Sequence, residues 1–232
     1  MRLGLLTVLV LVVDSSTPAV TAALVEVTAD GVTSRAQRST VDARAHGELL
    51  APQVDGVLAE VGARPAELGA IVAGLGPGPF TGLRVGLVTA ATMSQVLDIP
   101  AYGVCSLDGI GHPAAAGEPV LAASDARRRE VYWAVYDGAG QRLVGPEVGA
   151  PSVAAERARE LAVTVAVGDG AHRYADVLGL PLRAEPRYPD PHALAVLAAE
   201  RIRAGAPGDP LTPLYLRRPD AVAATARKPV LP

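Results

Sequence analysis

The stretch from Gly74 to Leu87, G-L-G-P-G-P-F-T-G-L-R-V-G-L, joins a glycine-rich loop to the start of a helix. The apolar run Ile71 to Ala73 predicts a buried strand that enters the loop, and from Gly82 onward apolar residues recur at helical spacing. Thr81 is then expected at the N-cap of that helix. Glycine permits backbone conformations that are closed to other residues, so the loop suits either an anion held by the free N–H groups of the first helical turn or a tight turn without a ligand.

Two common phosphate-binding motifs do not fit this loop. A P-loop ends in Gly-Lys-Ser/Thr, whereas the only lysine of the chain is Lys228. A dinucleotide fingerprint has the spacing G-x-G-x-x-G, whereas the glycines here fall at Gly74, Gly76, Gly78 and Gly82. The sequence therefore predicts neither a P-loop NTPase nor a dinucleotide-binding loop.

The chain repeats one order of predicted elements. The first half has strands at 7–13, 20–27 and 32–37, a helix at 46–61, a strand at 70–73, a helix at 82–97 and a strand at 101–105. The second half has strands at 119–124, 130–136 and 141–144, a helix at 152–161, a strand at 163–167 and helical stretches at 171–178 and 191–204. This repetition predicts a duplicated α/β fold with a cleft between the halves, the outline of the actin, hsp70 and sugar-kinase (ASKHA) superfold. We expect subdomains at 1–105 and 106–232, with 109–119 as linker and an extended tail from Pro207.

In that superfold the turn between the first two strands faces a nucleotide phosphate. Here the turn reads Asp14-Ser15-Ser16-Thr17, although Asp and Ser also favour an ordinary polar turn through local hydrogen bonds. The residues expected to face a nucleotide or other anion are Asp14, Ser16, Thr17, Gly76, Gly78, Thr81, Gly82 and Arg84. We expect no required cofactor and at most weak nucleotide binding.

The composition constrains the class of partner. A net charge of -3 gives no overall electrostatic drive toward nucleic acid, so any RNA-binding surface is expected on another protein. The single cysteine, Cys105, excludes an internal disulfide, fits a reducing compartment and is expected to be a buried, inert thiol. The apolar run 3–13 ends in Asp14 and is too short to span a bilayer. We therefore expect a buried first strand and a cytoplasmic protein with no membrane partner.

Four motifs occur in order along nearly the whole chain. The pattern G-x-G-P-G-S-F-T-G-x-R-x-G matches Gly74 to Gly86, with Pro79 in place of serine. The others are V-x-D-T-S-T at 12–17 with Ser15 for threonine, D-A-R-x-x-E-V-Y-W-A-x-Y at 125–136 and P-x-Y-L-R at 213–217. Together they resemble the bacterial TsaB proteins, also called YeaZ, of the machinery that makes N6-threonylcarbamoyladenosine in tRNA.

The resemblance implies a partner protein without a catalytic centre of its own. The catalytic paralogue, TsaD, holds a metal through a His-x-x-x-His pair on a helix and transfers threonylcarbamoyl to adenosine 37 of tRNA. The four histidines of this chain, His46, His112, His172 and His192, include no pair separated by four residues. The resemblance thus implies no catalytic residue and no metal, a heterodimer with TsaD, recruitment of the P-loop protein TsaE, and tRNA reached only through the complex. A homodimer of the isolated chain stays open.

The two predicted helices of the first half independently suggest a partner. One face of the helix at 82–97 would cover the sheet, and its second apolar face must meet another protein or stay exposed. Together with the helix at 46–61, it could form a four-helix interface between two related chains. The alternative is that both helices are buried within this domain. The expected interface residues are Leu50, Val54, Val57, Leu58, Val61, Val85, Val88 and Thr92.

Other interpretations stay open at this stage. The rival function is a nucleotide-dependent enzyme of the sugar-kinase type, with Asp14 organising a metal and Arg84 pairing with a phosphate. A peptidase is the least supported, because no Ser/His/Asp or metal-protease spacing is visible. The charged run 125–130 is interpreted as a solvated hairpin end, with a ligand site as the alternative. The basic residues of the tail, Arg217, Arg218, Arg227 and Lys228, are interpreted as solvated.

Overall fold

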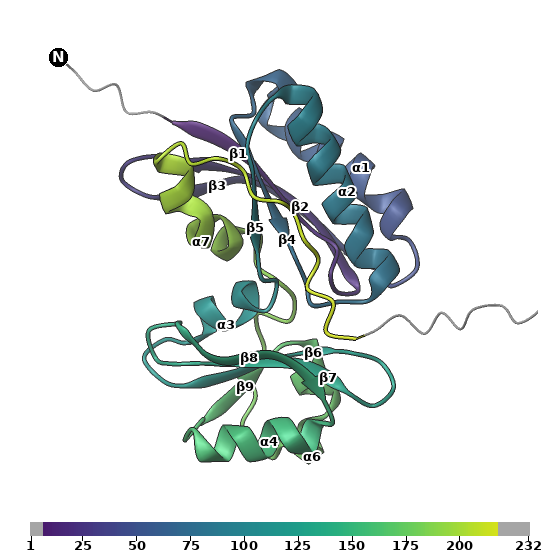
Figure 1. Cartoon of the computed structure of the whole chain (residues 1–232), viewed down its shortest axis with the longest axis vertical. Coiled ribbons are helices and arrows are strands. Elements are labelled where there is room, and N and C mark those ends of the chain that lie inside the picture. Colours follow the sequence, from purple (N-terminus) through teal and green to yellow (C-terminus); the bar gives the residue numbers. More distant parts are fainter. Residues whose placement is uncertain (1–6, 218–232) are drawn as a thin grey trace, which may run out of the picture.

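The computed structural model describes residues 7–217 as two α/β subdomains, each built on its own sheet (Figure 1). The first sheet has the order β3-β2-β1-β4-β5, in which the first three strands are antiparallel neighbours and β4 and β5 continue in parallel with β1. Its strands are β1 Val8–Asp14, β2 Ala19–Val27, β3 Val32–Val41, β4 Ala70–Gly74 and β5 Ala101–Val104. The strands β1, β2 and β4 are buried along almost their whole length because helices cover both faces of the sheet.

One face of this sheet is covered by α1 (His46–Val61) and α2 (Phe80–Leu97), which lie side by side in Figure 1. A short 3-10 turn, Pro65–Glu67, follows α1. The opposite face is covered by α7 (Pro191–Arg203), whose alanines at 195, 198 and 199 are small enough to let the helix pack closely on the sheet. The first sheet is thus completed by a helix from near the end of the chain.

The second sheet repeats the connectivity of the first, with the order β8-β7-β6-β9. Its strands are β6 Val120–Asp125, β7 Val131–Tyr136, β8 Arg142–Gly149 and β9 Val165–Val167. Helix α3 (Asp108–Ala114) packs on one face, and α4 (Pro151–Glu160) with α6 (Ala175–Leu178) on the other, while α5 (Asp169–Arg173) follows β9. In both sheets an antiparallel meander gains a parallel fourth strand beside its first strand. The predicted duplicated, actin-like (ASKHA) fold is confirmed.

Three predictions about local structure are wrong. Helix α2 begins at Phe80 with Pro79 at the N-cap, so Thr81 lies inside the first turn and caps nothing. The fixed φ of Pro79, -59°, ends the loop and starts the helix earlier than the apolar spacing suggested. The segment 109–119 is no simple linker, because α3 occupies its first half and buries Ile110 completely. The helical stretch expected at 171–178 is divided into α5 and α6.

The tail segment, residues 207–217, connects the two subdomains. The backbone N–H of Asp209 donates to the carbonyl of Ala101, and that of Leu214 donates to the carbonyl of Leu75, so the segment runs along the first sheet. Arg217 then donates to the carbonyl of Ala126 in the second subdomain at 2.7 Å. The predicted division at residue 105 stays a prediction, and Arg218, Arg227 and Lys228 lie outside the described residues. Between residues 7 and 217 no helix has both the length and the apolar character that a membrane span requires.

Candidate functional site

The turn between β1 and β2 is packed inside the protein. Asp14, Ser15, Ser16 and Thr17 are all less than 5% exposed. Ser15 Oγ donates to the carbonyl of Gly82 at 2.8 Å and accepts from the backbone N–H of Gly86 at 2.8 Å, which ties the turn to the first turns of α2. Ser15 therefore holds the turn against the start of α2.

The glycines of the loop permit this close approach. A Cβ at Gly78 would collide with the backbone carbonyl of Ser16, and one at Gly74 would overlap the Asp14 carboxylate. A Cβ at Gly86 would lie 2.6 Å from Ser15 Oγ. Gly76 has a φ of +88°, a backbone conformation that favours glycine. At these positions the chain itself fills the space beside the backbone.

The carboxylate of Asp14 is fully engaged by neighbouring groups. Its Oδ1 accepts from the backbone N–H and hydroxyl of Ser16 at 2.9 and 2.8 Å, and its Oδ2 accepts from Ser106 Oγ at 2.6 Å. Burial raises the pKa of Asp14, although the hydrogen bonds from Ser106 and Ser16 oppose that rise. Asp14, Ser16 and Thr17 point into the protein and do not line the pocket described next. Their expected role in nucleotide binding stays a prediction.

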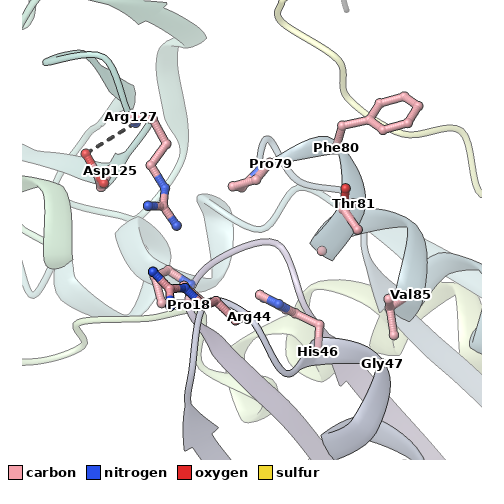
Figure 2. A pocket seen from close by; sticks show the side chains of 12 residues that line it. Pro18, Arg44, His46, Gly47, Pro79, Phe80, Thr81, Val85, Asp125 and Arg127 are labelled. Atoms are coloured by element: carbon pink, nitrogen blue, oxygen red, sulfur yellow. Dashed lines mark hydrogen bonds between the residues drawn. The ribbon is translucent and has the colours of Figure 1, made fainter.

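An open pocket of about 420 Å³ lies beside this turn, where the starts of α1 and α2 face the hairpin between β6 and β7 (Figure 2). Pro18, Ala43, Arg44, His46, Gly47, Pro79, Phe80, Thr81, Gly82, Val85, Asp125 and Arg127 line it. Of the residues expected to face an anion, Thr81 and Gly82 lie on its wall. Arg84 lies on the outer surface of α2, with its guanidinium 4.1 Å from the centre of the Phe80 ring and its Nε donating to the Tyr215 hydroxyl at 3.2 Å.

A second pocket of about 470 Å³ shares Pro18, Ala43, Asp125 and Arg127 with the first, so the two form one continuous cleft between the subdomains. We call this combined space the cleft. Its remaining lining residues are Asp169, His172, Arg173, Arg187 and Tyr188. Burial, followed by the nearby Asp125 charge, raises the pKa of Asp169 to about 6. The charged run that contains the arginines at 127–129 is visible in the sequence. The sequence does not show that Arg44, Arg173 and Arg187 lie near it, because only the fold brings these segments together.

His46, the only histidine of α1, lines the cleft and is also bonded to the turn between β1 and β2. Its side chain is buried, and its Nε2 lies 2.8 Å from the carbonyl oxygen of Thr17. One helical turn later Leu50 lies in the core. Between residues 7 and 217 no three His, Cys, Asp or Glu side chains come together as a metal-binding group.

The predicted partner surface divides into two parts. Leu50, Val54, Val57 and Leu58 are at most 5% exposed and pack against the first sheet, so their assignment to an interface is wrong. The apolar stripe of α1 is the face that covers the sheet, as the alternative interpretation held. Val61 and Val85 are half-buried, whereas Thr92 is exposed and Val88 is 61% exposed.

The outer face of α2 is therefore the apolar surface that stays open. Val96 is 76% exposed, and Ala91 and Thr92 lie between it and Val88 on the same side of the helix. We call Val88, Ala91, Thr92 and Val96 the α2 stripe. A groove of about 360 Å³ runs along its edge, between α2 and the tail segment.

The comparisons with known proteins agree with this fold. A solved YeaZ structure from Pseudomonas aeruginosa is similar over 90% of this chain and 100% of that chain, with a TM-score of 0.72 and 26% identity. Residues 39–189 match the family model described as TsaD, tRNA N6-adenosine threonylcarbamoyltransferase. The chain belongs to this family, in its TsaB (YeaZ) branch.

Curated relatives match this chain over different shares of its length. The tRNA threonylcarbamoyladenosine biosynthesis protein TsaB of Escherichia coli is 34% identical over 151 residues, which are 60% of this chain and 65% of that protein. An uncharacterized protein of Mycobacterium tuberculosis is 48% identical and covers 91% of this chain and 93% of its own length. One from Mycobacterium leprae is 47% identical, and the match spans 57% of that longer protein.

Proposed function

We propose that this TsaB-family chain is a required, non-catalytic subunit of the tRNA N6-threonylcarbamoyladenosine synthase. It pairs with a TsaD transferase, which performs the chemistry, and helps to recruit the ATPase TsaE. Family membership and the name of the Escherichia coli relative support a role in this modification. TsaD transfers the threonylcarbamoyl group, and this chain assembles the complex.

The observation that carries the proposal is the α2 stripe. Val88 and Val96 expose 61% and 76% of their surface on a helix whose other side is already buried against the sheet. Exposed valines along one helix, with the small Ala91 between them, provide an apolar surface that another helix can approach closely. A related fold would present its own α2 in the same way, so two such helices could bury their stripes against each other.

Two features of the turn region support a non-catalytic role. His46 and Leu50 stand one helical turn apart on α1, where the first binds the Thr17 carbonyl and the second fills the core. Because a leucine side chain has no atom that can bind a metal, these two positions cannot hold a metal as a pair. The rival kinase-type function needs Asp14 as a metal-organising carboxylate, but both of its oxygens accept hydrogen bonds from serine side chains.

Charge placed on the α2 stripe tests the proposal. Val88→Glu should leave the fold intact because Val88 faces solvent in the isolated chain, yet it should abolish capture by TsaD because the complex would bury an unpaired charge. Val177→Glu is the matched control, since Val177 is 51% exposed on α6 in the other subdomain. We would measure melting temperature, mass by light scattering, and binding to TsaD from the same organism.

The same samples test the catalytic assignment. The chain with TsaD and TsaE should support tRNA modification, whereas the chain alone should give none. Normal TsaD capture by folded Val88→Glu would move the interface elsewhere. Modification of tRNA in the strict absence of TsaD would refute the non-catalytic role.

A further inference from the structure

Three arginines from distant segments meet at the cleft. Arg44 precedes α1, Arg127 belongs to the hairpin between β6 and β7, and Arg187 precedes α7. All three side chains are exposed. Within residues 7–217 none of their guanidinium groups makes a hydrogen bond or ion pair. The nearby carboxylates of Asp42, Asp125 and Glu185 accept instead from the backbone N–H groups of these arginines.

Two of these charges share one pocket. Arg44 and Arg127 line the same space from opposite subdomains, and in Figure 2 both side chains extend into the region between the hairpin and Pro18. Two positive charges that face a common space repel each other. An anion between them attracts both, and because it is closer to each charge than they are to one another, the two attractions outweigh the repulsion. The pocket is therefore suited to a phosphate group.

The acidic groups of the cleft only partly offset these arginines. Both carboxylate oxygens of Asp125 already have partners. Its Oδ1 accepts a hydrogen bond from the backbone N–H of Arg127 at 3.3 Å, and its Oδ2 forms an ion pair with Arg173 at 3.8 Å. Asp169 lies deeper, and its burial beside Asp125 raises its pKa and disfavours its charge. Three guanidinium groups that have no ion-pair partner among the described residues thus line the cleft.

The positive surface extends beyond a single pocket. The hairpin continues through Arg128 and Arg129, which are also exposed, and the backbone at Arg127, Arg128 and Arg129 has φ values of 62°, 54° and 61°. These φ values belong to the tight turn that closes the hairpin, in which the backbone N–H of Glu130 donates to the carbonyl of Arg127 at 3.0 Å. Arg44, Arg127 and Arg187 are spread from the first pocket of the cleft to the second, which matches a chain of phosphates better than one small anion.

We propose that the cleft is a contact surface for the phosphate backbone of RNA, with Arg44, Arg127 and Arg187 as its principal contacts. The choice of RNA rests on the proposed function in tRNA modification. On this proposal the chain contributes directly to RNA binding, contrary to the expectation from its net charge of -3 that the basic surface would come from another protein. Net charge did not reveal the surface because the arginines converge only in the folded chain.

Removal of two charges from the cleft tests this proposal. The double variant Arg44→Gln/Arg127→Gln is compared with Arg64→Gln/Arg157→Gln, which changes the net charge equally at exposed positions that do not line the cleft. We would titrate a fluorescent, unmodified tRNA transcript with the chain alone and with the chain bound to TsaD, measuring anisotropy from 50 to 200 mM salt. We expect the cleft variant to lose about tenfold in affinity at low salt and its salt slope to fall by about 1 to 2.

The outcomes separate this proposal from the proposed function. Capture of TsaD by the cleft variant should be normal, so a loss of RNA affinity cannot reflect a failed complex. Failure of the wild-type chain to bind TsaD would refute the proposed function, while the RNA titration of the chain alone would still report on the cleft. Wild-type RNA affinity in the cleft variant, or an equal loss in the control, would overturn the RNA proposal. So would calorimetry in which pyrophosphate or ATP binding depends on Arg44 and Arg127 while RNA binding does not.

Discussion

Replacing Asp169 by asparagine should stabilise this protein at neutral pH. Asp169 begins α5, and its Oδ1 is buried without a hydrogen-bond partner within the described residues. Burial and the Asp125 charge raise its pKa from 3.8 to about 6. Because the folded state holds this proton more tightly than the unfolded state, unfolding free energy falls as pH rises through the window from about 4 to about 6.

The size of the effect follows from the two pKa values. A rise from 3.8 to about 6 corresponds to about 3 kcal/mol of unfolding free energy lost once the carboxyl group ionises, as an upper estimate. Asparagine keeps the shape and carries no charge, so Asp169→Asn should lack this loss and be the more stable protein at pH 7.5. Near pH 4 the two proteins should differ little, because the aspartate is then protonated in the folded state.

Urea denaturation of both proteins at pH 4.5, 5.5, 6.5 and 7.5 measures the difference directly. Titrating groups that do not interact with Asp169, such as Asp14 and Asp108, are present in both proteins and cancel in the comparison. Asp176→Asn, at an exposed position on α6, is the matched control and should leave the pH dependence unchanged. A constant stability difference between Asp169→Asn and the wild type across this range would refute the assignment of a buried, proton-holding carboxyl group.

Three further changes test the packing. Val57→Glu should prevent folding, because Val57 is completely buried on the side of α1 that faces the first sheet; a native-like circular dichroism spectrum of the variant would contradict its place in the core. Gly78→Val should lower the free energy of unfolding by on the order of 1 to 3 kcal/mol with or without nucleotide, because its Cβ collides with the Ser16 backbone. Unchanged stability in denaturant would show that the loop can move to accommodate the side chain. Arg217→Ala should loosen the tail segment by removing its bond to Ala126, which limited proteolysis near residue 210 would detect as faster cleavage than in the wild type.

The elements were predictable where a local pattern decides the structure. The repeated strand order and the helix at 46–61 follow from apolar periodicity, and the structure confirms both. Periodicity failed at Thr81, because the start of α2 depends on the fixed backbone of Pro79 rather than on apolar spacing. It also could not tell which of several apolar faces covers the sheet, so Val57 and Val88 were assigned to one surface although the first is core and the second is exposed.

The candidate site was less predictable, because it depends on contacts between distant segments. The motif glycines were recognised, but their reason is the backbone of Ser16 and the side chain of Ser15, which the sequence does not place. Arg44 and Arg187 carry no local signal at all, and only the two-subdomain topology sets them around the same cleft as Arg127.

The position of α7 has a consequence for how the chain emerges from the ribosome. The face of the first sheet formed by Val10, Val12, Val25, Val72 and Tyr102 stays uncovered until Leu194 and Ile202 have been synthesised. The five strands of that sheet leave the exit tunnel long before α7 is synthesised. The nascent chain therefore exposes an apolar sheet face while the whole second subdomain is made. A fragment that ends at residue 105 would keep this surface permanently and should aggregate, even though every strand of its sheet is present.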